Sequence, residues 1–283
     1  MISNTSSPAA RRIKITAMYA ILVLFALICL FPFYMLFVNA TRSTLQIQGS
    51  ISFIPSNWFF KNYRSLIDNG LNVYRAFFNS LFIASVSTIL GIYVSALTAF
   101  AFHIYNFKGK TLLYSVLLAT IMIPGQLGLI GFYQFMLQLN WLDSYFPLIL
   151  PSMAAASTVF FLRQFYSGTL PKELIEAARI DGAPEFMTFN FIVLPISVPA
   201  LATVGIGAFV GSWNNYLMPF ILLIDENKYT MPMLVQMLKT NVYATNLGAI
   251  YAGLFITVLP LIVVYLSLSR FIVGGVTLGG VKE

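Results

Sequence analysis

The chain has 283 residues, of which 59% are hydrophobic and only 9% are charged. Soluble domains contain about 25% charged residues, so this composition excludes an ordinary soluble enzyme, a disordered chain and a coiled coil. The net charge is +7, and in so apolar a chain it indicates basic cytoplasmic loops rather than nucleic-acid binding. Cys29 and His103 are the single cysteine and histidine, so neither an intramolecular disulfide nor a metal site is expected.

Long apolar segments predict six membrane-crossing helices, since one crossing requires about 20 such residues. In chain order they are residues 17–38, 79–103, 111–142, 144–162, a stretch within 186–224, and 247–269. Pro124 and Gly125 are predicted to interrupt the third. The fifth is predicted to begin near Pro199, because Pro195 and Pro199 should interrupt any helix that leads into it. The sequence therefore predicts an all-α, polytopic transmembrane bundle with both termini on one side.

The placement of Lys and Arg predicts that both termini are cytoplasmic. In that orientation ten of the 16 basic residues lie on the cytoplasmic side, as the positive-inside rule requires. The chain then divides into a cytoplasmic N-terminal tail (1–16), a first transmembrane helix with its outer loop (17–74), a five-helix core (75–271) and a cytoplasmic C-terminal tail (272–283).

The cytoplasmic loop between the fourth and fifth crossings predicts a short helix. Thr169 is expected to be its N-cap, Pro171 suits its first turn, and Gly182 can adopt the left-handed conformation that ends it. One face carries small or apolar side chains, namely Leu174, Ala177 and Ala178, with Ile175 alongside. An isolated helix of this kind would expose apolar surface, so we expect either this subunit or a partner to cover it.

The residues of this loop resemble a family motif. Glu176-Ala177-Ala178, followed at fixed spacing by Gly182 and by Ile192-x-Leu194-Pro195, is similar to the EAA motif of the membrane subunits of binding-protein-dependent ABC importers. Further stretches resemble the carbohydrate, maltose-type branch of that family. They are residues 55–63, Asn79-Ser80-Leu81, residues 123–126, Trp213-Asn214-Asn215-Tyr216 and residues 275–282.

The resemblance implies that the short helix is a coupling helix, which docks on a separate ATPase subunit. The implied contact residues are Glu176, Ala177, Ala178, Asp181 and Gly182. It also implies a sugar permease of the bacterial cytoplasmic membrane, paired with a second homologous permease, two ATP-binding subunits and an extracytoplasmic sugar-binding protein. No catalytic residue or cofactor is expected in this chain, because the partner ATPase binds ATP and magnesium. Gly109-Lys110-Thr111 lacks the leading glycine of a phosphate-binding loop.

A permease for polar solutes must place polar side chains at membrane depth. The candidate pathway residues are Asn79, Gln126, Trp213, Asn214, Asn215 and Tyr216. The hydroxyl side chains of the second crossing are also candidates, although hydrogen bonding between helices or packing of small residues is the favoured explanation for them. They are Ser80, Ser85, Ser87, Thr88, Ser95 and Thr98. Gly207-x-x-x-Gly211 predicts a close approach of two backbones, either within this chain or with a partner.

Three alternatives remain open. An ABC permease for another solute would differ in its pathway residues. A secondary transporter driven by an ion gradient would need an acidic or histidine relay within the membrane, and the second to sixth crossings offer only His103, at an edge. A membrane-embedded enzyme would need an acid–base or nucleophilic constellation within the crossings, and the sequence suggests none.

Overall fold

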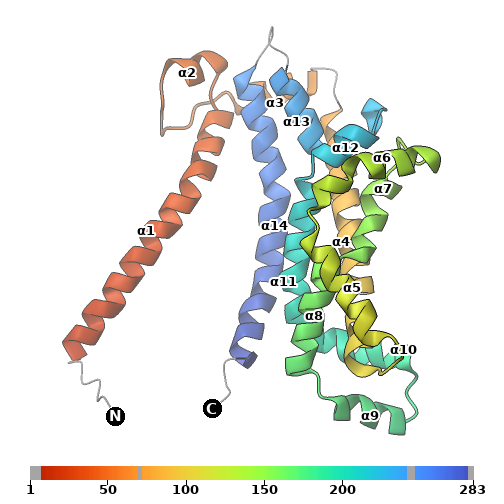
Figure 1. The fold of residues 1–283 in the computed structure, drawn as a ribbon. Helices are drawn as coiled ribbons and strands as arrows, with labels where there is room; N and C mark the ends of the chain where they lie inside the picture. Colours follow the sequence, from red (N-terminus) through yellow and green to blue (C-terminus); the bar gives the residue numbers. More distant parts are fainter. Residues whose placement is uncertain (1–7, 69–71, 241–245, 280–283) are drawn as a thin grey trace. The chain divides into compact units, whose positions relative to one another are not determined.

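The computed structural model describes residues 8–68, 72–240 and 246–279 (Figure 1), and these residues form helices and no β-strand. The α-helices are α1 (Pro8–Ala40), α2 (Thr44–Gly49), α3 (Phe59–Asp68), α4 (Val73–Ile104), α5 (Lys110–Met122), α6 (Leu129–Gln138), α7 (Phe146–Ile149), α8 (Ala156–Thr169), α9 (Lys172–Ile180), α10 (Glu185–Thr188), α11 (Leu194–Trp213), α12 (Leu217–Leu222), α13 (Met231–Thr240) and α14 (Leu247–Gly279). Shorter turns are η1 (Gly125–Gly128), η2 (Leu150–Ala154), η3 (Phe189–Val193) and η4 (Glu226–Lys228). The predicted all-α fold is confirmed.

Five segments are long and apolar enough to cross a membrane, and a bent pair of helices can supply a sixth crossing. The five are Arg11–Ala40, Val73–Ile104, Phe146–Thr169, Glu185–Trp213 and Leu247–Phe271. In the bent pair, Lys110–Met122 and Gly125–Gln138 meet at 91°. Pro124, whose backbone is extended, separates the two halves, because proline cannot donate the hydrogen bond that would continue the helix. The predicted polytopic bundle and the break in its third crossing are confirmed.

The fifth crossing begins earlier than the sequence predicts. Glu185–Trp213 is continuous over 29 residues, so the prediction that it starts near Pro199 after a break is wrong. Pro199 lies inside α11, and Pro195 is the second residue of α11, after the π-helical turn Phe189–Val193. There the Leu194 N–H donates to the first carbonyl of the turn, five residues back. This wider turn accommodates a proline, which lacks an N–H and crowds the preceding carbonyls, without ending the helix.

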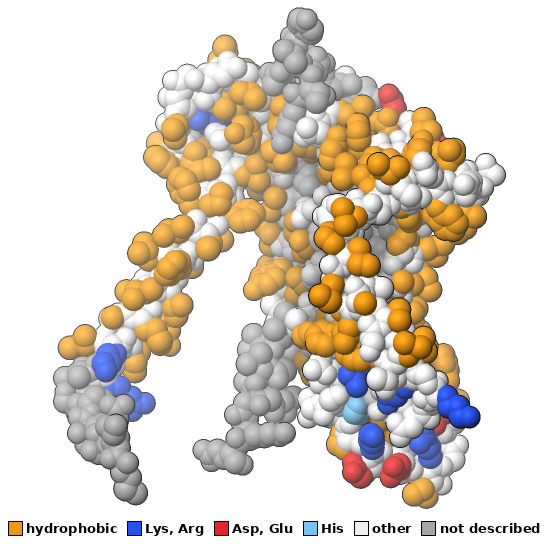
Figure 2. Space-filling view, in the orientation of Figure 1, with side chains coloured by type: hydrophobic (Ala, Val, Ile, Leu, Met, Phe, Trp, Pro, Cys, Tyr) orange, Lys and Arg blue, Asp and Glu red, His pale blue; other side chains and the backbone are white. Residues whose placement is uncertain are grey.

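The chain forms two compact units, which are described separately. The first comprises Met1–Gly70 and Leu238–Ile256. In it the Asn62 side chain on α3 donates to the carbonyls of Ala40 (2.9 Å) and Arg42 (2.8 Å), so the segment after α1 is ordered against the end of that helix. Exposed hydrophobic side chains cover α1 from Ile15 to Phe37 (Figure 2), as a membrane-facing helix requires.

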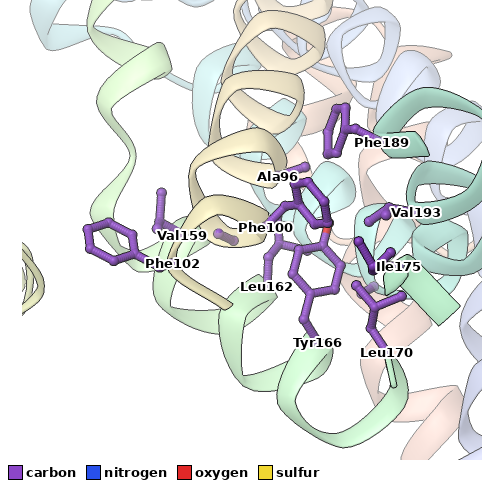
Figure 3. Close-up of a cluster of buried hydrophobic side chains, with 12 residues drawn as sticks. Ala96, Phe100, Phe102, Val159, Leu162, Tyr166, Leu170, Ile175, Phe189 and Val193 are labelled. Carbon is purple, nitrogen blue, oxygen red and sulfur yellow. The ribbon is translucent and has the colours of Figure 1, made fainter. Parts of the chain in front are cut away.

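The second unit, which comprises Leu71–Met237 and Thr257–Glu283, contains the candidate sites. Its α4 packs against α8 and α11 along the bundle (Figure 1). A buried cluster at one end joins these helices to α9 (Figure 3). Charged side chains gather at that same end (Figure 2). A second buried cluster, of Ala84, Phe209 and Trp213, lies farther along α4 and α11.

Candidate functional site

The first candidate site is α9, the short helix between α8 and α10. Its first residue follows Pro171, whose backbone is extended. The prediction that Thr169 caps this helix is wrong, because α8 continues as far as Thr169. The Thr169 hydroxyl donates to the Phe165 carbonyl of α8 at 2.7 Å. Glu173 lies in the first turn of α9, where a negative charge is favourable near the positive end of the helix dipole.

Gly182 ends α9 in the way the sequence predicts. Its φ is +78°, in the left-handed region that glycine tolerates best. The Gly182 N–H donates to the Arg179 carbonyl (3.0 Å), and the Ala183 N–H donates to the Ala178 carbonyl (2.9 Å). These two bonds form a Schellman motif, which satisfies carbonyls at the helix end and fixes the direction in which the chain leaves it.

The inner face of α9 is anchored in the buried cluster of Figure 3. Ile175 is 1% exposed and Ala178 is 6% exposed. Ile175 belongs to the same cluster as Tyr166 and Phe189, so α9 packs against α8 and against the start of the fifth crossing (Figure 3). The predicted apolar face of α9 is therefore split between two surfaces of the helix. Leu174 is 37% exposed, whereas Ala178 is buried with Ile175.

The outer face of α9 is open in this chain. The exposed residues of α9 and of the two positions after it are Lys172, Glu173, Leu174, Glu176, Ala177, Arg179, Ile180, Asp181 and Gly182. Ile180 is 87% exposed, so it adds a large apolar side chain to this open surface. Of the five contact residues that the resemblance implies, four lie on this open surface and Ala178 supports it from beneath.

Polar contacts tie the end of α9 to two other helices. The Glu185 carboxylate on α10 accepts a hydrogen bond from Arg179 Nε and another from the Tyr105 hydroxyl, both at 2.6 Å. The Arg179 guanidinium also lies 5.6 Å from the centroid of the Tyr105 ring. Burial raises the pKa of Tyr105, and its hydrogen bond to Glu185 raises it further. Tyr105 follows the last residue of α4, so this group links α9, α10 and α4.

The second candidate site is a cavity of about 280 Å³ between α4, the η2–α8 segment and α11. Its lining residues are Ser87, Thr88, Gly91, Ile92, Leu148, Ser152, Ala155, Thr158, Gly207, Ala208, Gly211, Ser212 and Asn215. All of them are uncharged, and many carry hydroxyl or amide groups. The Ser87 and Ser212 hydroxyl oxygens lie 3.0 Å apart, so they form a hydrogen bond between α4 and α11.

Of the six candidates named first, only Asn215 lines this cavity, and the hydroxyl candidates Ser87 and Thr88 of the second crossing line it too. Trp213 is 1% exposed, and its Nε1 donates to the Thr257 carbonyl at 3.0 Å. Asn79 donates through Nδ2 to the carbonyls of Asn227 (2.9 Å) and Tyr229 (3.0 Å). Both side chains therefore bind backbone within the second unit. Their positions favour roles in holding the fold.

The other three predicted pathway residues lie elsewhere. Gln126 is exposed in η1, and Asn214 is exposed just beyond the last residue of α11. The Tyr216 ring stacks on Phe220 with centroids 5.2 Å apart. Sequence reasoning missed Ser152, Thr158 and Ser212 as lining residues. Single hydroxyl residues are too common in membrane helices to be selected without knowing which helices face each other.

Gly207 and Gly211 do not bring two backbones together within the described chain. A Cβ added to either glycine would meet nothing within 4 Å, and both glycines line the cavity. The close approach occurs instead at Gly91, where an added Cβ would lie 2.8 Å from the Ser152 carbonyl oxygen. The part of the prediction that placed this contact inside the subunit is wrong; contact with a partner stays a prediction.

At the other end of α4 from α9, Asp143 joins two loops. Its carboxylate accepts hydrogen bonds from Lys228 Nζ (2.6 Å) and from the N–H groups of Ile224 (2.9 Å) and Asp225 (3.0 Å). Burial alone would raise the pKa of Asp143, but the hydrogen bonds from Lys228 and the two backbone amides outweigh burial and lower it. The ionised carboxylate therefore stabilises this connection.

These features define a polytopic membrane protein with an exposed, anchored helix at one end. Residues 9–277 match the family described as binding-protein-dependent transport system inner membrane component, and the chain belongs to that family. It is a multi-pass permease subunit of an ABC importer in the cytoplasmic membrane, a transport subunit whose ATPase is a separate protein. Such a subunit works with another permease subunit, an ATPase and a solute-binding protein.

Individual relatives are similar over nearly the whole chain. The arabinooligosaccharides transport system permease protein AraQ of Bacillus subtilis is 30% identical and covers 100% of both chains. The lactose permease protein LacG of Rhizobium radiobacter is 32% identical, over 96% of this chain and 98% of its own length. The sn-glycerol-3-phosphate permease protein UgpE of Salmonella typhimurium is 34% identical, over 91% of this chain and 94% of its own.

A solved structure has the same fold. It is the crystal structure of a bacterial ABC transporter involved in the import of the acidic polysaccharide alginate. The TM-score is 0.79 at 21% sequence identity, and the match covers 95% of this chain and 99% of the other. At this identity the similarity establishes the arrangement of helices.

Proposed function

We propose that this chain is a permease subunit of an ATP-driven importer for sugars or oligosaccharides. The observation that carries the coupling part of the proposal is the outer face of α9, which is exposed although its inner face is anchored at Ile175 and Arg179. The sugar part is supported by relatives named for arabinooligosaccharides and lactose, which match this chain over almost its full length.

In this proposal α9 is the coupling helix. Glu176, Ala177, Asp181 and Gly182 form the contact with an ATPase subunit, and Ala178 packs beneath them. Because Glu185 joins α9 to the end of α4, movement of the docked helix passes into the membrane bundle. ATP and magnesium are bound by the ATPase and not by this chain.

The complete importer in this proposal contains a second homologous permease, two ATP-binding subunits and an extracytoplasmic sugar-binding protein. Both termini of this chain and α9 then lie in the cytoplasm. The tails at residues 1–16 and 272–283 flank a first helix with its outer loop (17–74) and a five-helix core (75–271). Among the predicted pathway residues, Asn215 is the one that we assign to the substrate route, because it lines the cavity.

Reconstitution tests this proposal. The chain is purified with its partner subunits, placed in lipid vesicles and supplied with its binding protein. ATP hydrolysis and uptake are then measured with labelled arabinotriose, lactose and sn-glycerol-3-phosphate. We expect an uncharged sugar to stimulate both activities. Stimulation by sn-glycerol-3-phosphate alone would support an importer for another solute. Uptake that needs an ion gradient and no ATP would support the secondary-transporter alternative and refute ours.

A further inference from the structure

Three basic residues occur at the end of the second unit where α5 and α9 begin and α8 ends. Lys110 is the first residue of α5, Lys172 is the first residue of α9, and Arg163 lies in the second half of α8. We propose that these three cations form a lipid site, which binds the phosphate of an anionic phospholipid from the cytoplasmic leaflet. The inference rests on the proposed function only for its orientation, which places α9 in the cytoplasm.

The ring of Tyr114 on α5 brings two of these cations together. The Arg163 guanidinium carbon lies 4.0 Å from the centroid of this ring, as in a cation–π contact. Lys110 lies four residues before Tyr114 on α5, so the two side chains share one face of that helix. Phe102 of α4 supports the Tyr114 ring, with centroids 5.5 Å apart. The charges of Arg163 and Lys172 both repel the Lys110 ammonium, so the three cations form one group.

The lipid site contains hydrogen-bond donors that the described chain leaves unused. Arg163 Nε and the Tyr114 hydroxyl are buried, and neither has a hydrogen-bond partner among the described residues. Lys110 Nζ donates to the Tyr105 carbonyl (2.7 Å) and to Asn106 Oδ1 (3.4 Å), which uses two of the three donors of an ammonium. Buried donors normally have partners, so these indicate a ligand that accepts hydrogen bonds.

The positive charge of the lipid site is not neutralised within the described chain. None of the three cations forms an ion pair with a described residue, although Glu173 directly follows Lys172. Arg179, the other basic residue of α9, pairs instead with Glu185. Like charges repel strongly where the surroundings have a low dielectric constant, so an anion among them is favourable. Phosphate oxygens suit Arg and Lys, which bind them with charge-assisted hydrogen bonds.

The apolar surface beside the cations distinguishes a phospholipid from free phosphate. Leu113, three residues after Lys110, is 54% exposed, and Phe160, three residues before Arg163, is 39% exposed. Because α5 begins and α8 ends at this end of the unit, both apolar side chains lie deeper in the membrane than their cations. Hydrophobic side chains also lie along α5 as far as the charged end of the unit (Figure 2). Phospholipids have the same order, since the phosphate lies at the interface and the acyl chains lie deeper.

Lys110→Gln and Lys108→Gln form a matched pair that tests the lipid site. Each removes one ammonium from the same end of the unit, but Lys108 is exposed and lies before α5. The complete importer is purified in detergent, and phosphatidylglycerol or phosphatidylcholine with identical acyl chains is added. Native mass spectrometry then measures bound lipid. We expect the unmodified importer to prefer phosphatidylglycerol. Lys110→Gln should weaken this binding about fivefold, the effect of one basic residue near an anionic membrane surface, and Lys108→Gln should leave it unchanged.

Arg163→Gln and Arg163→Lys give a second measurement. We expect Arg163→Gln to weaken phosphatidylglycerol binding, and Arg163→Lys to retain most of it because the charge remains. Equal binding of the two lipids, or equal binding by Lys110→Gln and Lys108→Gln, would overturn the lipid site. Displacement of phosphatidylglycerol by excess inorganic phosphate would overturn it in favour of a free anion.

A partner subunit is the other occupant that this experiment detects. Loss of the second permease or of the ATPase from the purified Lys110→Gln importer would show that the cations contact protein, and would overturn the lipid site. None of these measurements requires transport. Their failure is therefore distinct from failure of the proposed function, in which the unmodified importer takes up no uncharged sugar.

Discussion

Ile175, which is 1% exposed, is the largest side chain that α9 buries against the bundle. Replacing a buried isoleucine with alanine costs about 2–5 kcal/mol. Because α9 has only nine residues, and isolated helices shorter than about 12 residues are marginal, this loss should detach α9 locally and leave the bundle folded. A loss of about 3 kcal/mol corresponds to a roughly 100-fold increase in the local opening equilibrium.

Hydrogen exchange measures this opening directly. The reporters are the amides of Asp181, Gly182 and Ala183, whose hydrogen bonds exist only while α9 is formed. We expect Ile175→Ala to reduce their protection about 100-fold. Leu174→Ala is the control, since it removes the same number of carbon atoms from the neighbouring position, which is 37% exposed. It should change the protection little.

The comparison can refute the reasoning in two ways. Equal protection in both variants would mean that the buried cluster does not hold α9 in place. A loss of protection spread through α4 and α11 in Ile175→Ala would mean that α9 is not a separate unit of local stability. If the reasoning holds, Leu174→Ala alters only the face that we propose docks on the ATPase, so it should weaken ATPase contact while α9 stays folded.

Two further predictions concern the ends of the second unit. Gly182→Pro should abolish ATP-coupled uptake and leave membrane insertion intact. Proline can neither adopt a φ of +78° nor donate the backbone hydrogen bond that Gly182 makes to the Arg179 carbonyl. Normal uptake by this variant would contradict the prediction. The lowered pKa of Asp143 predicts stability that is complete above about pH 4, the pKa in an unfolded chain, and is lost as pH falls through the lower native value. Melting temperatures measured at decreasing pH should show this loss. Asp143→Asn should reduce the dependence without abolishing it, because protonation of Glu185 would also weaken its hydrogen bonds from Arg179 and Tyr105.

The sequence predicts most of the membrane crossings because length and hydropathy are local properties. The break at Pro124 was also predictable from local sequence, because Pro124 is followed by Gly125 and can adopt the extended backbone conformation that the structure shows. Pro199 was misjudged because a membrane helix tolerates an internal proline, and Pro199 lies inside α11. The π-helical turn at Phe189–Val193 precedes Pro195, and no residue within it announces a π-turn.

The ends of α9 were largely predictable, but its orientation was not. Pro171 and Gly182 act through their own backbone preferences, so they mark the start and end of a helix in any context. Which face becomes buried depends on Tyr166 and Phe189, which come from other elements and supply the surface that receives Ile175. A stripe read from helical spacing alone therefore combined Leu174, which faces outward, with a buried alanine.

Contacts with distant parts of the chain also decide which polar side chains remain available to bind a substrate. Trp213 and Asn79 are chemically suited to sugars, yet each donates to backbone carbonyls far along the chain. Thr88 is a less obvious candidate by residue type, but its hydroxyl has no partner in the described structure. A membrane interior penalises every unpaired polar group. Of the buried hydroxyls that have no partner among the described residues, Thr88 is the one that lines the cavity, so position in the fold as well as residue type decides which polar groups a substrate can reach.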